Sequence, residues 1–154
     1  MSIQIPADYY DKDYCLTGNK GHYGHGPWAP YTHPVYLVQN RKLASILKYV
    51  FKPKTALVLG CATGHLVQAL RERGVKAWGI DVSSWAIDNA ARCVKPFLVR
   101  GDCCDLSQWK DNEFDLVVGW NVLEHVTMPQ LLEAIKEAAR VSRDSVAINI
   151  AITD

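Results

Sequence analysis

Residues 56–66 read ALVLGCATGHL, a short apolar run that ends in a glycine turn and continues into a helical pattern. An apolar run bounded by turn residues predicts a buried strand, and HLVQALRER at 65–73 predicts an amphipathic helix closed by Gly74. Small residues in such a turn let the backbone approach a ligand, and the first helical turn presents free N–H groups. The stretch therefore predicts a strand–turn–helix unit whose turn either faces a ligand or is simply a tight connection.

The alternation of strands and helices continues along the chain. A helix is predicted to begin at Pro34 and to stop before Pro53. Strands alternating with helices predict parallel βαβ units, and hence an α/β, Rossmann-like doubly wound fold. Its mostly parallel sheet has about five strands, with helices on both faces. The predicted strands are 55–60, 75–80, 97–99, 114–119 and 145–153, and the other predicted helical segments are 83–94, 121–126 (one short turn) and 129–142.

The first 33 residues differ from the rest of the chain. They are rich in Gly, Pro, Tyr and His and show neither strand nor helix periodicity. We expect an aromatic, glycine-rich N-terminal arm or lid at 1–33, followed by a single Rossmann-like domain at 34–154.

Composition narrows the class of protein and its partners. A chain of 154 residues with 49% hydrophobic residues suffices for one core, and a net charge of +1 predicts no nucleic-acid partner. The sequence contains neither a signal peptide nor an apolar run long enough to cross a membrane, so a cytoplasmic protein is expected. The five cysteines include no CxxC pair and are interpreted as reduced thiols. Cys103 and Cys104 are interpreted as small apolar residues that pack in the protein interior. No metal is expected, because Cys15, His22 and His25 lack a second close pair of ligands.

Acidic residues follow the second and third predicted strands. Asp81 lies about 20 residues after Gly60, a spacing at which a carboxylate accepts from both ribose hydroxyls; the alternative is a turn or helix-capping aspartate. Asp102 follows the third strand, where a carboxylate can accept from the amine of an adenine; Asp105 is the alternative. A dinucleotide fingerprint would place glycine at 60, 62 and 65, but only Gly60 matches, which argues against a nicotinamide-dependent oxidoreductase.

These features together resemble the class I S-adenosylmethionine-dependent methyltransferases. The resemblance spans about residues 35–154 and rests on VLGCATG, GIDVS, GDCCDL and FDLVVGWNVLEHV. It implies S-adenosylmethionine as the cofactor. It further implies four contacts with the cofactor. The methionine part lies in the first motif, at Gly60, Cys61, Ala62 and Gly64, and the ribose binds at Asp81 and Val82 of the second motif. The adenine binds at Asp102 and Cys103 of the third motif, and the amino-acid end contacts the turn after the fourth strand, at Gly119, Trp120 and Asn121.

The function implied is in-line transfer of a methyl group to a small-molecule acceptor. His125 is a candidate general base, and Tyr14, His22, Tyr23 and His25 of the arm are candidates for a lid or acceptor pocket. The alternatives are a non-catalytic S-adenosylmethionine-binding module or a fragment of a larger methyltransferase.

The fifth predicted strand, 145–153, is largely apolar and is followed only by Asp154. The resemblance leads us to expect a short form that lacks the last two strands of the family fold. The fifth strand would then be a sheet edge, and apolar edges pair readily with other strands. We therefore expect either a homodimer through this strand or an N-terminal arm that covers it.

Overall fold

The computed structural model describes residues 9–17 and 33–150. Its strands form one sheet in the order β3-β2-β1-β4-β5, and every pair is parallel. The order reverses between β1 and β4, and α/β sheets bind ligands in the crevice beyond such a switch point. The strands are β1 (Thr55–Leu59), β2 (Lys76–Asp81), β3 (Leu98–Arg100), β4 (Phe114–Trp120) and β5 (Ser142–Asn149).

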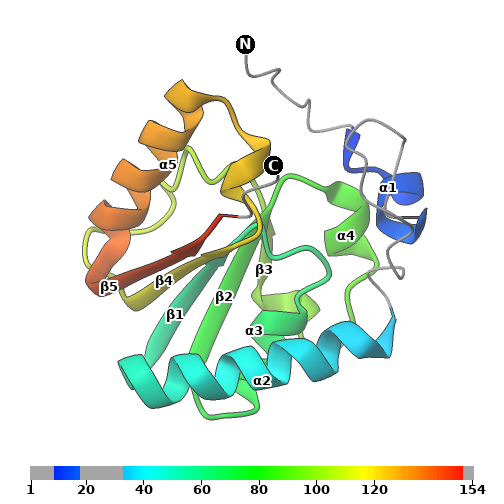
Figure 1. The fold of residues 1–154 in the computed structure, drawn as a ribbon, viewed down its shortest axis with the longest axis horizontal. Helices are drawn as coiled ribbons and strands as arrows, with labels where there is room; N and C mark the ends of the chain where they lie inside the picture. Colours follow the sequence, from blue (N-terminus) through cyan, green and yellow to red (C-terminus); the bar gives the residue numbers. More distant parts are fainter. Residues whose placement is uncertain (1–8, 18–32, 151–154) are drawn as a thin grey trace.

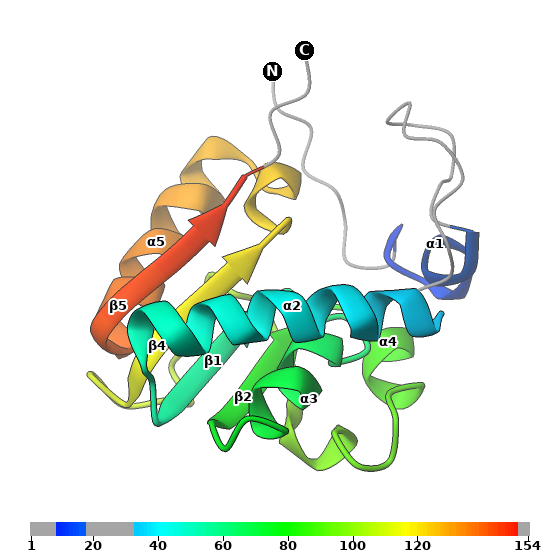
Figure 2. The ribbon, with the colours of Figure 1, turned by 60° about the horizontal axis from the view of Figure 1, so that its bottom comes forward.

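Helices cover both faces of this sheet, which confirms the predicted α/β Rossmann-like fold (Figure 1, Figure 2). One face is covered by α2 and α3 and the other by α5. The helices are α1 (Lys12–Thr17), α2 (Pro34–Phe51), α3 (His65–Arg71), α4 (Ser84–Asp88) and α5 (Met128–Val141), with 3-10 turns η2 (Lys95–Phe97) and η3 (Leu123–His125).

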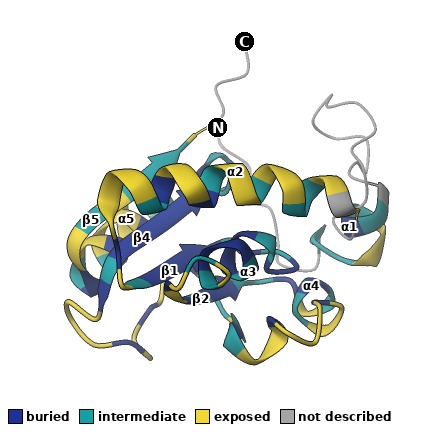
Figure 3. Ribbon diagram, turned by 90° about the horizontal axis from the view of Figure 1, so that it is seen from below, coloured by how far each residue is buried: buried dark blue, intermediate teal, exposed yellow. Residues whose placement is uncertain are grey.

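The side chains of β1 show how the two layers share the core. Ala56 and Val58 pack against residues of α2 and α3, whereas Leu57 and Leu59 pack toward α5. Successive side chains of a strand point to opposite faces, so a strand covered on both faces is apolar throughout. The central strands are accordingly buried along their length, while the outer surface of α2 is exposed (Figure 3).

Most predicted boundaries agree with the structure to within two residues, but the end of α4 and the start of β5 differ by more. The helix predicted at 83–94 ends at Asp88: Asn89 is its C-cap and leaves the helical conformation, and the N–H of Ala90 donates three residues back, to Ile87 at 3.3 Å, in place of a helical bond. The last strand begins at Ser142 and not at 145, so that α5 passes directly into β5. Ser142 already pairs with Phe114, ahead of a register shift in β4.

A capping box formed by Thr127 and Gln130 begins α5. The Oε1 atom of Gln130 accepts from the backbone N–H of Thr127 at 3.0 Å and from its hydroxyl at 2.9 Å. Such reciprocal capping satisfies groups that a helix start otherwise leaves without partners.

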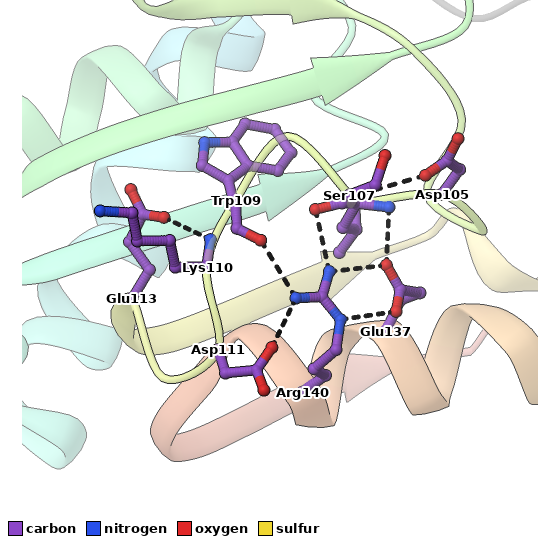
Figure 4. A network of polar contacts seen from close by, with 9 residues as sticks. Asp105, Ser107, Trp109, Lys110, Asp111, Glu113, Glu137 and Arg140 are labelled. Carbon is purple, nitrogen blue, oxygen red and sulfur yellow. Dashed lines mark hydrogen bonds and ion pairs between the residues drawn. The ribbon is translucent and has the colours of Figure 1, made fainter.

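Arg140 on α5 ties down the long loop between β3 and β4 (Figure 4). Its guanidinium donates to both carboxylate oxygens of Glu137, at 2.7 and 2.8 Å, and to Asp111 at 2.8 Å. It also donates to the carbonyl oxygens of Leu106 and Trp109, each at 3.0 Å. Leu106 and Trp109 are buried in the core on the α5 side of the sheet. The network therefore holds this irregular loop in the position in which these two side chains pack into the core.

Replacing Arg140 by alanine is expected to lower the free energy of unfolding by about 2–3 kcal/mol, because several charge-assisted hydrogen bonds are lost together. Lys136 on the same helix is the matched control, since its pair with Glu133 is exposed and its loss should cost only about 0.5 kcal/mol. Urea unfolding of both variants measures the difference. Equal losses would show that the network does not hold the loop.

The two remaining expectations concern membranes and the sheet edge. No helix in the described part of the chain is long and apolar enough to cross a membrane.

The edge of the sheet at β5 is open among the described residues. In that part of the chain β5 pairs only with β4, and the side chain of Val146 on β5 is 38% exposed. The described part of the arm, α1, packs on α4 and not on β5 (Figure 1). The homodimer through β5 stays a prediction.

Candidate cofactor-binding site

A cavity of about 210 Å³ opens at the carboxyl ends of the central strands. Each of four strands contributes to its wall: Gly60 and Ala62 follow β1, Asp81 ends β2, Asp102 follows β3 and Asn121 follows β4. Parallel strands bring their carboxyl ends to one edge of a sheet, so residues far apart in sequence meet here. Four of the sequence motifs therefore converge on one site.

The glycine turn after β1 requires its glycine. Gly60 has a φ of +60°, and a Cβ atom added to it would lie 2.3 Å from Cγ2 of Val122. Both conditions disfavour a side chain at this position, the first through the backbone conformation and the second through the close contact. The turn thus packs closely on the segment after β4, and both line the cavity.

Asp81 is held rigidly at the end of β2. One carboxylate oxygen accepts from the backbone N–H of Ala62 at 2.7 Å, and the other accepts from that of Ser83 at 2.8 Å. Burial raises the pKa of this carboxyl above its ordinary value, and the two backbone hydrogen bonds oppose that shift. A carboxylate offers about four acceptor positions, so about two remain for a ligand in the cavity that Asp81 lines.

The loop after β3 offers one of its two candidate acids to the cavity. Asp102 lies on the wall, and its Oδ1 atom accepts from the backbone N–H of Cys104 at 2.8 Å. Asp105 caps its own turn by accepting from the N–H of Ser107 at 3.1 Å and does not line the cavity. Burial raises the pKa of the neighbouring Cys103 thiol to about 11, so this thiol is protonated and weakly nucleophilic at neutral pH.

Part of the N-terminal arm forms another wall. Tyr10, Tyr14 and Cys15 line the cavity, as does His125 from η3. The ring of Tyr10 lies 4.9 Å from that of Tyr14 and 6.1 Å from that of His125, measured between centroids. These aromatic side chains line the same cavity as Asp81 and Asp102.

Ser83 links this arm to the sheet. Ser83 is the N-cap of α4, and its Oγ accepts from the N–H of Ala86 at 3.1 Å. Sequence reasoning missed its second contact, in which the same hydroxyl donates to the carbonyl oxygen of Tyr10. Since Ser83 also donates its N–H to Asp81, the arm and the carboxylate share one support.

Replacing Ser83 by alanine is expected to lower the free energy of unfolding by about 1 kcal/mol through loss of the cap. It should also speed proteolysis within residues 1–33, because the arm loses its hydrogen bond to the sheet. Limited proteolysis followed by mass spectrometry measures the second effect. Ser45→Ala on the exposed surface is the control, and equal proteolysis of both variants would contradict the anchoring role.

Several sequence-predicted residues lie off the described wall. Cys61 is buried and packs against Gly79, and Gly64 caps the start of α3. Gly119 lies within β4, and Trp120 at its end is 41% exposed. Val82 and Cys103 do line the cavity, whereas His22, Tyr23 and His25 lie outside the described residues. Their individual roles stay predictions.

Comparison with known proteins agrees with this arrangement. Residues 56–145 match the model of a family described as a methyltransferase domain. A search of curated proteins finds no match to the chain.

Solved structures share the fold. A protein from Pyrococcus horikoshii OT3 has a TM-score of 0.64 at 24% identity, over 77% of this chain and 63% of that one. A SAM-dependent methyltransferase from Archaeoglobus fulgidus has a TM-score of 0.62 at 22% identity, over 75% of this chain and 52% of that one. The cyclase SpnF has a TM-score of 0.57 at 21% identity, over 70% of this chain and 44% of that one. The chain thus spans less than two thirds of the length of these proteins.

The family match covers more than half of the chain. The chain therefore belongs to the methyltransferase-domain family.

Proposed function

We propose that this protein methylates a small-molecule acceptor by in-line displacement. The observation that supports this most is the convergence of residues from four strand ends on one cavity, with the aromatic arm on another wall. When bound there, S-adenosylmethionine supplies a methyl group activated by the adjacent sulfonium. The protein's part is then mainly to position two reactants, which can supply about 7–11 kcal/mol of the barrier reduction.

The residues of the strand ends are proposed to hold the cofactor. Asp81 accepts from the ribose hydroxyls and Asp102 accepts from the adenine amine. The tight turn at Gly60 and Ala62 lets the backbone approach the methionine part, and Asn121 faces its amino-acid end. All of these line the cavity.

The acceptor is proposed to bind beside the arm, between Tyr10, Tyr14 and His125. Residues 1–33 act as a lid whose closure excludes water, and 34–154 form the cofactor-binding domain. Among the described wall residues Asp81 and Asp102 are acidic, and none is a lysine or arginine. This distribution disfavours an anionic acceptor. All five cysteines are free thiols, which suits the proposed cytoplasmic setting.

The test is release of S-adenosylhomocysteine by the full chain with a panel of uncharged, cationic and anionic small molecules. Turnover with an uncharged or cationic acceptor is expected. Tight cofactor binding without turnover on any acceptor would contradict the proposal and indicate a binding module.

His125→Gln is expected to lower kcat by about 100-fold or more if its ring removes the acceptor proton, with little change in KM for the cofactor. His65→Gln is the matched control, because His65 stacks on Tyr36 and does not line the cavity. Steady-state kinetics of both variants with the best acceptor of the panel measure kcat and the KM for the cofactor. Equal kcat values would remove His125 from the mechanism.

A further inference from the structure

Three consecutive residues after β3 bring potential metal ligands together. A carboxylate oxygen of Asp102 and the Sγ atoms of Cys103 and Cys104 all lie within 4.8 Å of one another. Cys103 is buried, Cys104 is half-buried and Asp102 is exposed. Asp102 and Cys103 also line the cavity, whereas Cys104 does not.

A turn produces this convergence. In a strand, successive side chains point to opposite faces and could not meet. Here the carboxylate of Asp102 accepts from the N–H of Cys104 at 2.8 Å, and the carbonyl of Asp102 accepts from the N–H of Asp105 at 3.0 Å. Cys104 is further fixed by α5, because its Sγ donates to the carbonyl oxygen of Gln130 at 3.4 Å. The loop therefore holds both thiols beside the carboxylate, a role beyond filling apolar space.

We propose that Asp102, Cys103 and Cys104 form a binding site for a thiophilic divalent cation of the Zn²⁺ or Cd²⁺ class. Two sulfur ligands select soft cations over Mg²⁺ or Ca²⁺, and a carboxylate completes a donor set that zinc accepts. Each thiol loses its proton to solvent as its sulfur binds the ion, and no electron is transferred. Because Asp102 is exposed, water can take the fourth position.

The geometry requires little movement. With metal–sulfur bonds of about 2.3 Å, ligands of a tetrahedral site lie about 3.8 Å apart. The ligand atoms already lie within 4.8 Å of one another, so side-chain rotations that shorten these separations by about 1 Å or less suffice. The folded loop thus supplies the site without rearrangement of the sheet.

The ion and the cofactor should exclude each other. This part of the inference rests on the proposed cofactor site, in which Asp102 binds the adenine. An ion that occupies Asp102 and Cys103 removes that acceptor and lies in the wall of the cavity. Soft cations would therefore inhibit the enzyme by competing with S-adenosylmethionine.

The first experiment titrates the full chain with Cd²⁺ alone, and follows binding by calorimetry and by thiolate-to-metal absorbance. One ion per chain is expected, with no binding of Mg²⁺. Cys104→Ser should weaken Cd²⁺ binding by at least about 100-fold, the upper end of what loss of an outer-shell partner costs. Cys93→Ser is the control, because Cys93 is an exposed thiol outside the cluster, and it should bind as wild type does. Unchanged affinity in Cys104→Ser would overturn the site.

The second experiment repeats the titration with S-adenosylhomocysteine at about 100 times its own Kd, which should weaken Cd²⁺ binding by about 100-fold if binding is exclusive. Unchanged Cd²⁺ affinity would overturn the competition. Cys104 does not line the cavity, so Cys104→Ser should still bind S-adenosylhomocysteine, which also shows that the variant is folded. Cofactor binding without Cd²⁺ binding would refute this site alone. Cd²⁺ binding without cofactor binding would refute the proposed function alone.

Discussion

Replacing Asp81 by alanine is expected to weaken the binding of S-adenosylhomocysteine by about 100-fold or more, because two charge-assisted hydrogen bonds to the ribose are lost. The carboxylate is already oriented by the N–H groups of Ala62 and Ser83, so no other side chain can readily take its place. Isothermal titration calorimetry of the variant measures the loss. Unchanged affinity would remove Asp81 from the site.

Asp105→Ala is the matched control for this variant. Asp105 is an acid of a neighbouring loop that caps its own turn and does not line the cavity, so its loss should leave cofactor affinity unchanged.

The pH dependence of binding gives a second measure of Asp81. Only the ionised carboxylate can accept from both hydroxyls, and burial raises the pKa of Asp81 above its ordinary value of 3.8. As the pH is lowered, the affinity should therefore begin to fall at a higher pH than it would for an exposed aspartate. Calorimetric titrations at several pH values measure this.

Gly60→Ala is expected to lower the free energy of unfolding by about 2–4 kcal/mol. About 1–2 kcal/mol arises from the left-handed backbone conformation and the rest from displacement of Val122, whose Cγ2 would lie 2.3 Å from the new Cβ. Val122 lines the cavity, so cofactor affinity should fall as well. Urea unfolding and cofactor titration measure the two effects.

Two other glycines separate the effect of the left-handed backbone conformation from the effect of the close contact. Gly74 has a φ of +75°, but a Cβ added there would meet no atom within 4 Å, so Gly74→Ala should cost only about 1 kcal/mol. At Gly79 a Cβ would lie 2.6 Å from that of Cys61 with no positive φ, so Gly79→Ala isolates the crowding. If Gly60→Ala destabilises no more than Gly74→Ala does, the close packing of the turn on Val122 is wrong.

The fold was predictable from the sequence because local periodicity and the order of elements determine a doubly wound sheet. The apolar run at 55–60 and the amphipathic pattern at 65–73 each correspond to an observed element. The early end of α4 was missed because the pattern of apolar residues continues past Asn89, whereas the backbone leaves the helical conformation at Asn89. The early start of β5 depends on its pairing with Phe114, which is not a local property.

The cavity wall was predictable only where residues follow the ends of strands. Asp81 and Asp102 could be placed because parallel strands end at one edge of the sheet. The contact of Ser83 with Tyr10 could not, because it joins the domain to an arm that has no periodic pattern. The approach of Cys103 to Cys104 depends on the turn at Asp102, whose conformation the residue types alone do not specify.

The central claim is that the cavity at the strand ends binds S-adenosylmethionine. Calorimetric titration of the full chain with S-adenosylhomocysteine and, separately, with NAD tests it most directly. We predict one S-adenosylhomocysteine bound per chain and no heat of binding for NAD. Binding of NAD in its place, or of neither compound, would contradict the account.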